Sequence, residues 1–161
     1  MKTHIDTPQG VFTAYFSEHG LAGLDFPAAK PAKAKDTGEA KLPATVRAWE
    51  KTTAAALRAV LAGKDPKALP PLDLSAGTPF QQSVWRELLK IGPGRTKSYG
   101  EIANLIGRSR AVRAVGGACG ANPIPVLVPC HRVLAANKKL GGFSGGLERK
   151  ISLLAAEGVT V

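Results

Sequence analysis

The pattern of apolar and polar positions changes along the chain and predicts different elements in its two halves. Near the N-terminus, residues 10–16 and 20–26 are two apolar runs on either side of the polar segment 17–19, which is the pattern of a β-hairpin. Between residues 45–61 the apolar side chains recur at helical spacing, and Gly63 is a suitable C-terminal stop. These elements predict a small N-terminal α/β unit.

Two stretches beside these elements carry no periodic pattern. Residues 27–43 are rich in Pro, Ala and Lys, and we expect a mobile loop there. Residues 64–77 contain three prolines and are typical of a linker between domains. We therefore expect an N-terminal domain with its linker at residues 1–77 and a second domain at residues 78–161. Nothing in the first domain has the pattern of a catalytic site.

The second domain begins with a helix whose start is marked by a capping box. Thr78 is followed by Pro79 at the first helical position and by Gln81 three residues further on. We expect this helix to end near Gly92. Its predicted buried face consists of Phe80, Val84, Trp85, Leu88 and Leu89.

Two further helices have the arrangement of a helix-turn-helix. A second capping box, at Ser98, opens a helix that runs through Ile106. A turn containing glycine follows, and Ser109 is the expected cap of a helix over residues 110–119. Short helical hairpins also occur in ordinary bundles, so the shape alone does not establish DNA binding.

The remaining residues predict a buried strand, a turn and a last helix. Residues 126–128 are apolar and lead into Cys130, which we therefore place at the end of a short strand. A glycine-rich turn at 141–146 precedes a helix that ends at Glu157 and Gly158. The expected apolar stripe of this helix is Leu147, Ile151 and Leu154. The predicted fold class is α/β: a small N-terminal domain of hairpin or sheet plus helix, then a mostly helical domain with a helix-turn-helix.

Charge is distributed unevenly between the two predicted domains. The chain has 161 residues, 44% of them hydrophobic, and a formal net charge of +10. Residues 1–77 carry 10 basic and 8 acidic side chains, whereas residues 78–161 carry 12 basic and 4 acidic ones. A basic surface confined to one domain favours a polyanionic partner, nucleic acid above all. No apolar run has the length of a membrane span, and the polar start does not resemble a secretory signal.

Cysteine usage predicts a cytoplasmic protein with reduced thiols. Two cysteines, Cys119 and Cys130, cannot form a disulfide framework. We expect no zinc site, because neither Cys-x-x-Cys nor His-x-x-x-His spacing is present. No other metal or cofactor is indicated.

The pair Cys130-His131 allows two interpretations. A cysteine becomes a nucleophile only when its thiol ionises, and a neighbouring imidazole that is oriented by an acid assists this ionisation. A buried structural cysteine beside a capped histidine is the alternative. The surrounding motifs decide between these two interpretations.

Several motifs within residues 80–158 resemble one known family. The sequence PCHRV at 129–133 is similar to the active-site signature of the O6-alkylguanine-DNA alkyltransferases. Further matches to the same family, in the same order, are SYGEIA (98–103), RAVGGA (113–118), Asn122-Pro123 and FSGGL (143–147). The N-terminal part resembles the family only in its length and its hairpin-then-helix plan.

The resemblance implies DNA repair by direct reversal. Family members bind duplex DNA through the helix-turn-helix from the minor groove, rotate an alkylated guanine out of the stack and transfer its alkyl group to the cysteine. The thioether does not hydrolyse, so each molecule acts once as a self-inactivating S-methyltransferase. The implied partner is double-stranded DNA that contains O6-alkylguanine. We expect a monomer without a cofactor and without membrane association.

When the functional residues of the family are matched to this sequence one by one, the resemblance assigns DNA contacts to the helix-turn-helix. Arg113 matches the arginine that fills the gap left by the rotated base. Tyr99 matches the tyrosine that crowds the backbone phosphate and donates a hydrogen bond to the departing guanine. Small residues on the recognition helix would permit close approach in a narrow groove. The expected groove-facing residues are Ala111, Ala114, Gly116, Gly117 and Cys119.

The same correspondence assigns the chemistry. Cys130 would be the thiolate, and His131 would act as base through a water molecule. Glu157 matches the acid on the last helix that orients the imidazole. The dipole at a helix C-terminus favours cations, so a carboxylate at this position itself indicates a charged partner. Asn122 matches the asparagine that hydrogen-bonds the turn carrying the cysteine. The rotated base would be bound by Tyr99 and by backbone groups of Val133 and Ser144.

Three positions depart from the family pattern. Gly120 stands where many relatives have an arginine, which predicts weaker DNA binding. Phe143 replaces a tyrosine and therefore lacks one hydroxyl contact. Cys119 occupies a position often held by a larger apolar residue, and we expect it to be non-catalytic.

Two other classes of function are alternatives. A non-catalytic module that binds and flags DNA damage would share the fold, but a related group of this kind has tryptophan in place of the cysteine, and Cys130 argues against it. A cysteine hydrolase that uses Cys130, His131 and Glu157 would turn over a small ester. The helix-turn-helix and the basic second domain disfavour a hydrolase.

Overall fold

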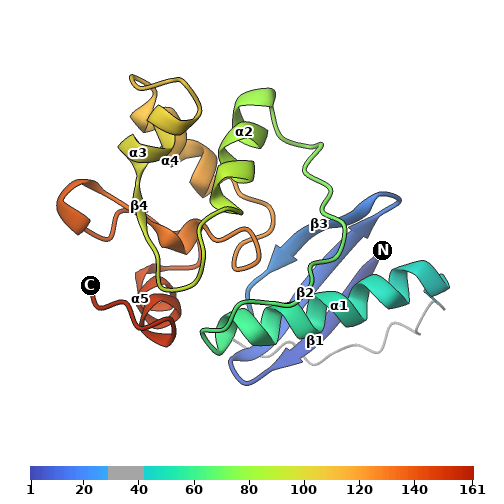
Figure 1. The fold of residues 1–161 in the computed structure, drawn as a ribbon. Coiled ribbons are helices and arrows are strands. Elements are labelled where there is room, and N and C mark those ends of the chain that lie inside the picture. Colours follow the sequence, from blue (N-terminus) through green and yellow to red (C-terminus); the bar gives the residue numbers. More distant parts are fainter. Residues whose placement is uncertain (29–41) are drawn as a thin grey trace.

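The computed structural model describes residues 1–28 and 42–161, and most of the loop expected at 27–43 lies outside them. An antiparallel sheet with one long helix forms one side of the molecule, and shorter helices form the other (Figure 1). Buried apolar side chains from both sides make one continuous cluster, which includes Phe12 and Leu57 as well as Val84 and Ile102. The observed α/β fold agrees with the predicted class.

The N-terminal sheet has three antiparallel strands in the order β1-β2-β3. The predicted hairpin is confirmed as β2 (Gly10–Ser17) and β3 (Gly20–Asp25). The first strand, β1 (Lys2–Thr7), was not predicted. Its inward face has only Thr3 and Ile5, so the short run lacks the apolar alternation by which a strand is recognised.

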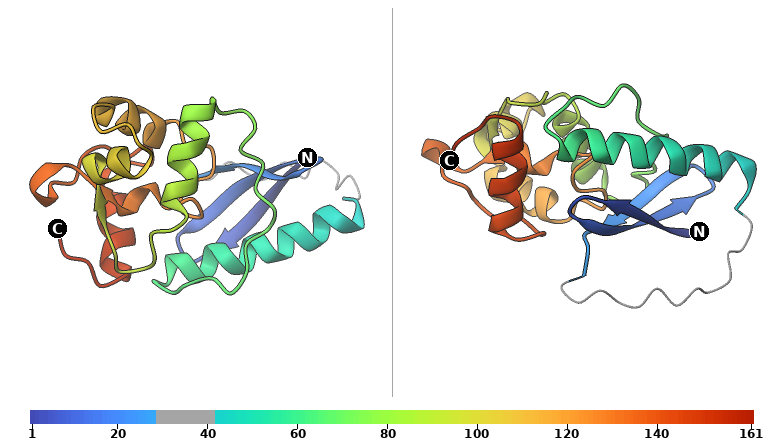
Figure 2. Two further views of the ribbon diagram at one scale, coloured as in Figure 1. Left: turned by 45° about the horizontal axis from the view of Figure 1, so that its top comes forward. Right: turned by 90° about the horizontal axis from the view of Figure 1, so that it is seen from below.

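The predicted first helix is confirmed as α1 (Ala44–Leu61), which covers one face of the sheet (Figure 2). Val46, Leu57 and Val60 lie on its buried side. Gly63 follows the helix with φ +77°, a left-handed conformation that glycine adopts without the steric cost of a Cβ atom.

The proline-rich segment 64–77 borders the sheet rather than crossing open space. The Leu21 amide donates to the Pro71 carbonyl and the Asp73 amide donates to the Leu21 carbonyl, each over 2.8 Å. The Ser17 hydroxyl also donates to the Asp73 carboxylate over 2.5 Å. The segment therefore acts as an ordered edge of the N-terminal sheet.

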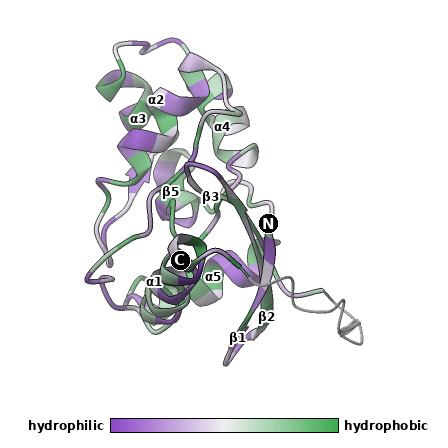
Figure 3. Cartoon of the chain, turned by 90° about the vertical axis from the view of Figure 1, so that its right-hand side faces the viewer, coloured by the Kyte–Doolittle hydropathy of each residue, from purple (hydrophilic) through white to green (hydrophobic). Residues whose placement is uncertain are grey.

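The second half contains three short helices that pack on one another. Both predicted capping boxes are present, at the start of α2 (Pro79–Leu88) and of α3 (Tyr99–Leu105). The prediction that the first of these helices ends near Gly92 is wrong, because the α-helix stops at Leu88. In Figure 3 these helices carry both polar and apolar segments, as expected of helices with one buried face.

The helix-turn-helix is completed by α4 (Val112–Gly120), which packs against α3. The expected cap at Ser109 is wrong, because the N-cap residue is Ala111 and no side chain caps this helix. The start of α4 therefore leaves backbone N–H groups without a side-chain partner. None of the helices in the described part of the chain is long and apolar enough to cross a membrane.

The predicted strand at 126–128 is wrong. These residues are buried, but they form turns in which Val126 has φ +75°. Prolines 123, 125 and 129 cannot donate to a strand ladder, which favours the irregular backbone. Cys130 is accordingly not at the end of a strand but opens the 3-10 turn η1 (Cys130–Arg132). The strand β5 (Val133–Leu134) follows and pairs in parallel with β4 (Lys97–Ser98).

The chain ends with the 3-10 turn η2 (Ala136–Lys138), the glycine-rich loop and the helix α5 (Leu147–Ala156). The predicted apolar stripe is wrong for Leu147 and Ile151, which are 47% and 41% exposed. The buried face is instead Lys150, Leu153, Leu154 and the following Glu157. The helix turns two charged side chains inward because both find buried polar partners there.

Candidate active site

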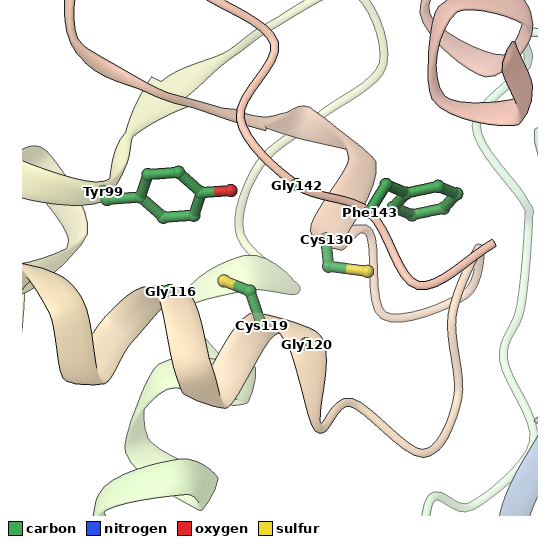
Figure 4. A pocket seen from close by; sticks show the side chains of 7 residues that line it. All are labelled: Tyr99, Gly116, Cys119, Gly120, Cys130, Gly142 and Phe143. Atoms are coloured by element: carbon green, nitrogen blue, oxygen red, sulfur yellow. The ribbon is translucent and has the colours of Figure 1, made fainter. Parts of the chain in front are cut away.

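A pocket of about 320 Å³ lies between the helix-turn-helix and the glycine-rich loop. The side chains of Tyr99, Cys119 and Cys130 lie around this space, with Phe143 at its far side (Figure 4). The lining residues are Tyr99 of α3, Gly116, Cys119 and Gly120 of α4, Cys130 of η1, and Gly142 and Phe143 of the loop. The pocket therefore brings the predicted nucleophile next to the predicted DNA-binding helix.

The turn that carries Cys130 is held by the side chain of Asn122. Its amide Nδ2 donates to the Val128 carbonyl over 2.8 Å, and its Oδ1 accepts from the Ile124 amide over 2.9 Å. The Cys130 amide donates to the Val128 carbonyl over 2.8 Å. The side chain of this buried asparagine thus supplies hydrogen bonds to a stretch of backbone whose prolines prevent it from pairing as a strand.

Cys130 is almost fully buried, with 4% of its surface exposed. Burial raises the pKa of the thiol, because an apolar environment disfavours the thiolate, and the nearby Asn122 amide and Lys150 ammonium oppose this rise. The thiol is therefore protonated in the free protein near neutral pH. A nucleophilic role requires a base that takes up its proton.

His131 and Glu157 form a fully buried pair. His131 Nε2 lies 3.0 Å from Glu157 Oε2, and neither side chain is exposed. Although burial raises the pKa of the Glu157 carboxyl, hydrogen bonds from His131 and Arg132 lower it to about 2. Burial lowers the pKa of His131, and the Glu157 carboxylate opposes that change. The pair is therefore an ionised carboxylate beside a neutral imidazole.

This arrangement determines which nitrogen of His131 is basic. An ionised carboxylate only accepts hydrogen bonds, so Nε2 carries the proton that it donates to Glu157. In a neutral imidazole the other nitrogen, Nδ1, then has a free lone pair. Nδ1 is buried and has no hydrogen-bond partner among the described residues. The structure thus leaves a basic atom available one residue from the thiol.

Two buried cations beside this pair were not predicted as functional residues. Arg132 donates from Nε and Nη2 to the Glu157 carboxylate over 2.8 and 2.9 Å, and from Nη1 to the Ile91 carbonyl over 2.6 Å. Lys150 is fully buried and donates from Nζ to the carbonyls of Val133 and Gly142 over 2.7 and 3.2 Å. The sequence signal that could have indicated a buried role for Lys150 is its spacing of seven residues from Glu157, which places both residues on one face of the last helix.

Tyr99 occupies the first position of α3, and its ring lines the pocket. Burial raises the pKa of its hydroxyl, which therefore remains a donor near neutral pH. A Cβ atom on Gly141 would lie 2.8 Å from that hydroxyl, and Gly141 has φ +67°. Only glycine allows the loop to pass this close to the tyrosine.

The residues predicted to face DNA are spread along α4 and the turn before it. Arg113, Ala114 and Gly117 are exposed, and Gly116 and Cys119 line the pocket. Ala111 lines an open concavity together with Gly107, Arg108, Ser109 and Arg110. A single helix therefore presents both an exposed arginine and a wall of the pocket.

Three other predicted residues have different surroundings. Cys119 is buried, and burial raises the pKa of its thiol to about 12, which makes it a poor nucleophile. Val133 is buried, and its carbonyl accepts from Lys150, whereas Ser144 is exposed. Neither Val133 nor Ser144 is among the residues that line the pocket. No cluster of metal-ligating side chains is present within residues 1–28 and 42–161.

The second half of the chain is similar to known proteins. Residues 79–159 match the family model of the 6-O-methylguanine DNA methyltransferase, DNA binding domain. The methylated-DNA–protein-cysteine methyltransferase of Mycobacterium tuberculosis is 58% identical over 86 residues, 53% of this chain and 52% of that protein. The inducible enzyme of that name from Bacillus subtilis is 55% identical over 82 residues, 51% of this chain and 46% of that protein. The chain thus spans about half the length of the curated relatives it matches.

Solved structures extend the similarity to nearly the whole chain. The crystal structure of Mycobacterium tuberculosis OGT in complex with DNA aligns with 96% of this chain and 90% of its own, at 39% identity and a TM-score of 0.75. An O6-methylguanine-DNA methyltransferase from Pyrococcus kodakaraensis aligns with 98% of both chains at 26% identity and a TM-score of 0.65. The chain belongs to the 6-O-methylguanine DNA methyltransferase family, whose DNA-binding domain corresponds to residues 79–159.

Proposed function

We propose that this protein repairs O6-alkylguanine in duplex DNA by moving the alkyl group irreversibly onto Cys130. The observation that carries the proposal is a buried thiol in a pocket beside α4, followed by an imidazole whose Nε2 is bound to a carboxylate 3.0 Å away. The similarity to an OGT crystallised with DNA supports the substrate class. The protein would be a stoichiometric, self-inactivating methyltransferase.

The transfer begins with removal of the thiol proton. His131 Nδ1 accepts this proton, through a bridging water or directly, while Glu157 balances the positive charge that forms on the imidazole. The thiolate sulfur then forms a bond to the alkyl carbon as the bond between that carbon and O6 breaks. The bonding electrons go to O6 of the guanine, which takes up the proton that His131 had accepted and so becomes a neutral guanine that is still attached to its DNA strand.

Tyr99 would stabilise the guanine as the leaving group. Its hydroxyl is protonated and its ring lines the pocket, so it donates a hydrogen bond to the guanine on which charge develops. The rotated base would also meet backbone groups of Val133 and Ser144. Because neither residue lines the pocket in the free protein, this part of the proposal requires the glycine-rich loop to adjust when the base enters.

The substrate base has to leave the duplex to reach Cys130. The exposed Arg113 on α4 would fill the gap in the stack, and the small residues Ala114 and Gly117 would let the helix approach the minor groove. Asn122 would hold the turn on which the nucleophile sits. We further propose that the first domain ends at residue 77, that the second begins at residue 78, and that the protein is a monomer. We also propose a cytoplasmic location, which the two unpaired thiols support.

Intact-protein mass spectrometry tests the proposal. After incubation with duplex DNA that contains O6-methylguanine, the protein should gain one methyl group per molecule, and peptide mapping should place it on Cys130. Cys130→Ala should bind the DNA and gain no mass, whereas Cys119→Ser should gain mass like the wild type. A methyl group on Cys119, or no mass gain in the wild type, would overturn the proposal.

The two alternative functions have distinct results in the same assay. A protein that only flags damage would bind methylated DNA with no change of mass. A cysteine hydrolase would instead release many product molecules per protein from a small ester such as p-nitrophenyl acetate.

A further inference from the structure

The pocket wall formed by Phe143 belongs to a loop that has little structure of its own. Four of the six residues at 141–146 are glycines, and Gly141 and Gly146 have positive φ angles. Within this loop the Gly146 amide donates to the Phe143 carbonyl, and Lys150 donates to the Gly142 carbonyl. Because glycine has the largest backbone freedom, contacts from outside the loop are needed to hold the Phe143 ring in place.

Phe26, which directly follows β3, supplies that contact. Its ring centroid lies 5.7 Å from that of Phe143 at an interplanar angle of 73°, an edge-to-face arrangement. On its other side Phe26 packs on Phe12 of β2, with centroids 5.6 Å apart, and Phe12 is fully buried. Three aromatic rings thus connect the core of the N-terminal sheet to the wall of the pocket.

Two further features join Phe26 to the loop. The Arg149 guanidinium carbon lies 4.9 Å from the Phe26 ring centroid, and Arg149 Nη2 donates to the Pro27 carbonyl over 3.1 Å. A Cβ atom on Gly145 would lie 2.6 Å from Phe26 Cε2 and 3.0 Å from Phe143 Cε1. The loop therefore passes flat against both rings, and only glycine fits at this point.

We infer that Phe26 is a positioning residue of the active site, which holds the Phe143 ring against the pocket from the N-terminal half of the chain. The inference rests on the proposed function, because it concerns the pocket that would receive the rotated base. Phe26 lies outside the segment that matches the family's DNA-binding domain, so it extends the site beyond residues 79–159. Phe143, which has no hydroxyl to bind a polar partner, depends on ring packing for its orientation.

The test compares Phe26→Leu with Phe16→Leu as a matched control. Phe16 lies on the neighbouring strand β2 and is 4% exposed, so its substitution also removes a ring from the sheet core but leaves the Phe26–Phe143 pair intact. Single-turnover transfer is measured against concentration with methylated duplex DNA and with free O6-benzylguanine. This separates the half-saturating concentration from the limiting rate.

Phe26→Leu should raise the half-saturating concentration by roughly three- to tenfold for both substrates, the range that corresponds to loss of one aromatic pair. The limiting rate should stay within about twofold, because the reacting groups are not displaced. Phe26→Tyr should restore the wild-type values. Phe16→Leu should lower the melting temperature and leave both kinetic parameters unchanged. Equal kinetics for Phe26→Leu and Phe16→Leu would overturn the inference.

Two additional measurements keep the inference separate from the proposed function. Hydrogen exchange of the amides at 141–146 should be faster in Phe26→Leu than in Phe16→Leu, whether or not the wild type transfers a methyl group. If Phe26→Leu does not fold, Arg149→Gln removes the cation over the same ring, and the half-saturating concentration should rise about two- to threefold. Unchanged exchange in the loop, or unchanged kinetics in Arg149→Gln, would contradict a positioning role.

Discussion

Glu157 Oε2 lies 3.0 Å from His131 Nε2, although 26 positions separate the two residues in the chain. The same carboxylate accepts from Arg132 Nε and Nη2, so one acid serves both residues that follow Cys130. The contact requires α5 to fold back beneath η1, and Leu153 and Leu154 seat it on the core. The last helix thereby connects the stability of the fold with the proposed chemistry.

Glu157→Gln should therefore affect both rate and stability. The amide keeps the shape but removes the charge that stabilises an imidazolium, so we expect slower transfer and an upward-shifted pH optimum, with DNA affinity changed little. Arg132 would lose its carboxylate in a buried place, which costs about 3 kcal/mol of the free energy of unfolding and roughly 10 °C in melting temperature. Stopped-flow transfer kinetics between roughly pH 6 and 9 and thermal denaturation measure the two effects. Wild-type kinetics across this range would remove Glu157 from the mechanism.

Acid should destabilise the protein in two steps. Burial holds the pKa of His131 below its ordinary 6.5, so the unfolded chain binds this proton more readily and stability falls as the pH drops below 6.5. The pKa of Glu157 is about 2 instead of 4.5, so its contribution is present above pH 4.5 and is lost as the pH falls from 4.5 towards 2. Urea unfolding at a series of pH values measures this profile. The second step should be absent in Glu157→Gln, whereas a flat profile from pH 7 to pH 3 would contradict both assignments.

Arg113→Ala should reduce repair in duplex DNA far more than reaction with free O6-benzylguanine. The exposed arginine would offset an unstacking cost of a few kcal/mol, which a free base does not incur. We therefore expect the transfer rate to fall by about two orders of magnitude with duplex DNA and not with the free base. Arg95→Ala is a suitable control, because Arg95 is exposed but lies outside α3 and α4. Equal losses on both substrates would rule out the proposed role of Arg113.

Lys150→Met should slow transfer while the protein remains folded. Lys150 joins the Val133 carbonyl to the Gly142 carbonyl of the pocket wall, and its ammonium lowers the pKa of the Cys130 thiol. Methionine fills the same space without a buried charge, so the free energy of unfolding should change by less than about 2 kcal/mol. We expect at least about a tenfold slower transfer and a shift to higher pH of Cys130 alkylation by iodoacetamide. An unchanged alkylation profile would show that Lys150 has no influence on the thiol.

Local signals in the sequence were enough to predict the elements that depend on nearby residues. The capping boxes at Thr78 and Ser98 set the starts of α2 and α3, because a cap is complete within four residues. The β2–β3 hairpin followed from two apolar runs and a short turn. The motif around Cys130 carried the family resemblance, since it is a continuous stretch of chain.

Tertiary structure decided the features that depend on distant partners. The inward face of α5 could not be read from its apolar residues, because Lys150 and Glu157 are buried by partners at Val133, Gly142, His131 and Arg132. The backbone before Cys130 is a turn rather than a strand, because the Asn122 side chain satisfies groups that the prolines leave without a ladder. Phe26 has no local signal at all, and only its packing on Phe143 brings it to the pocket. The sequence thus determined the helix starts, the hairpin and the reactive motif, and the long-range contacts decided which charges are buried and what surrounds the thiol.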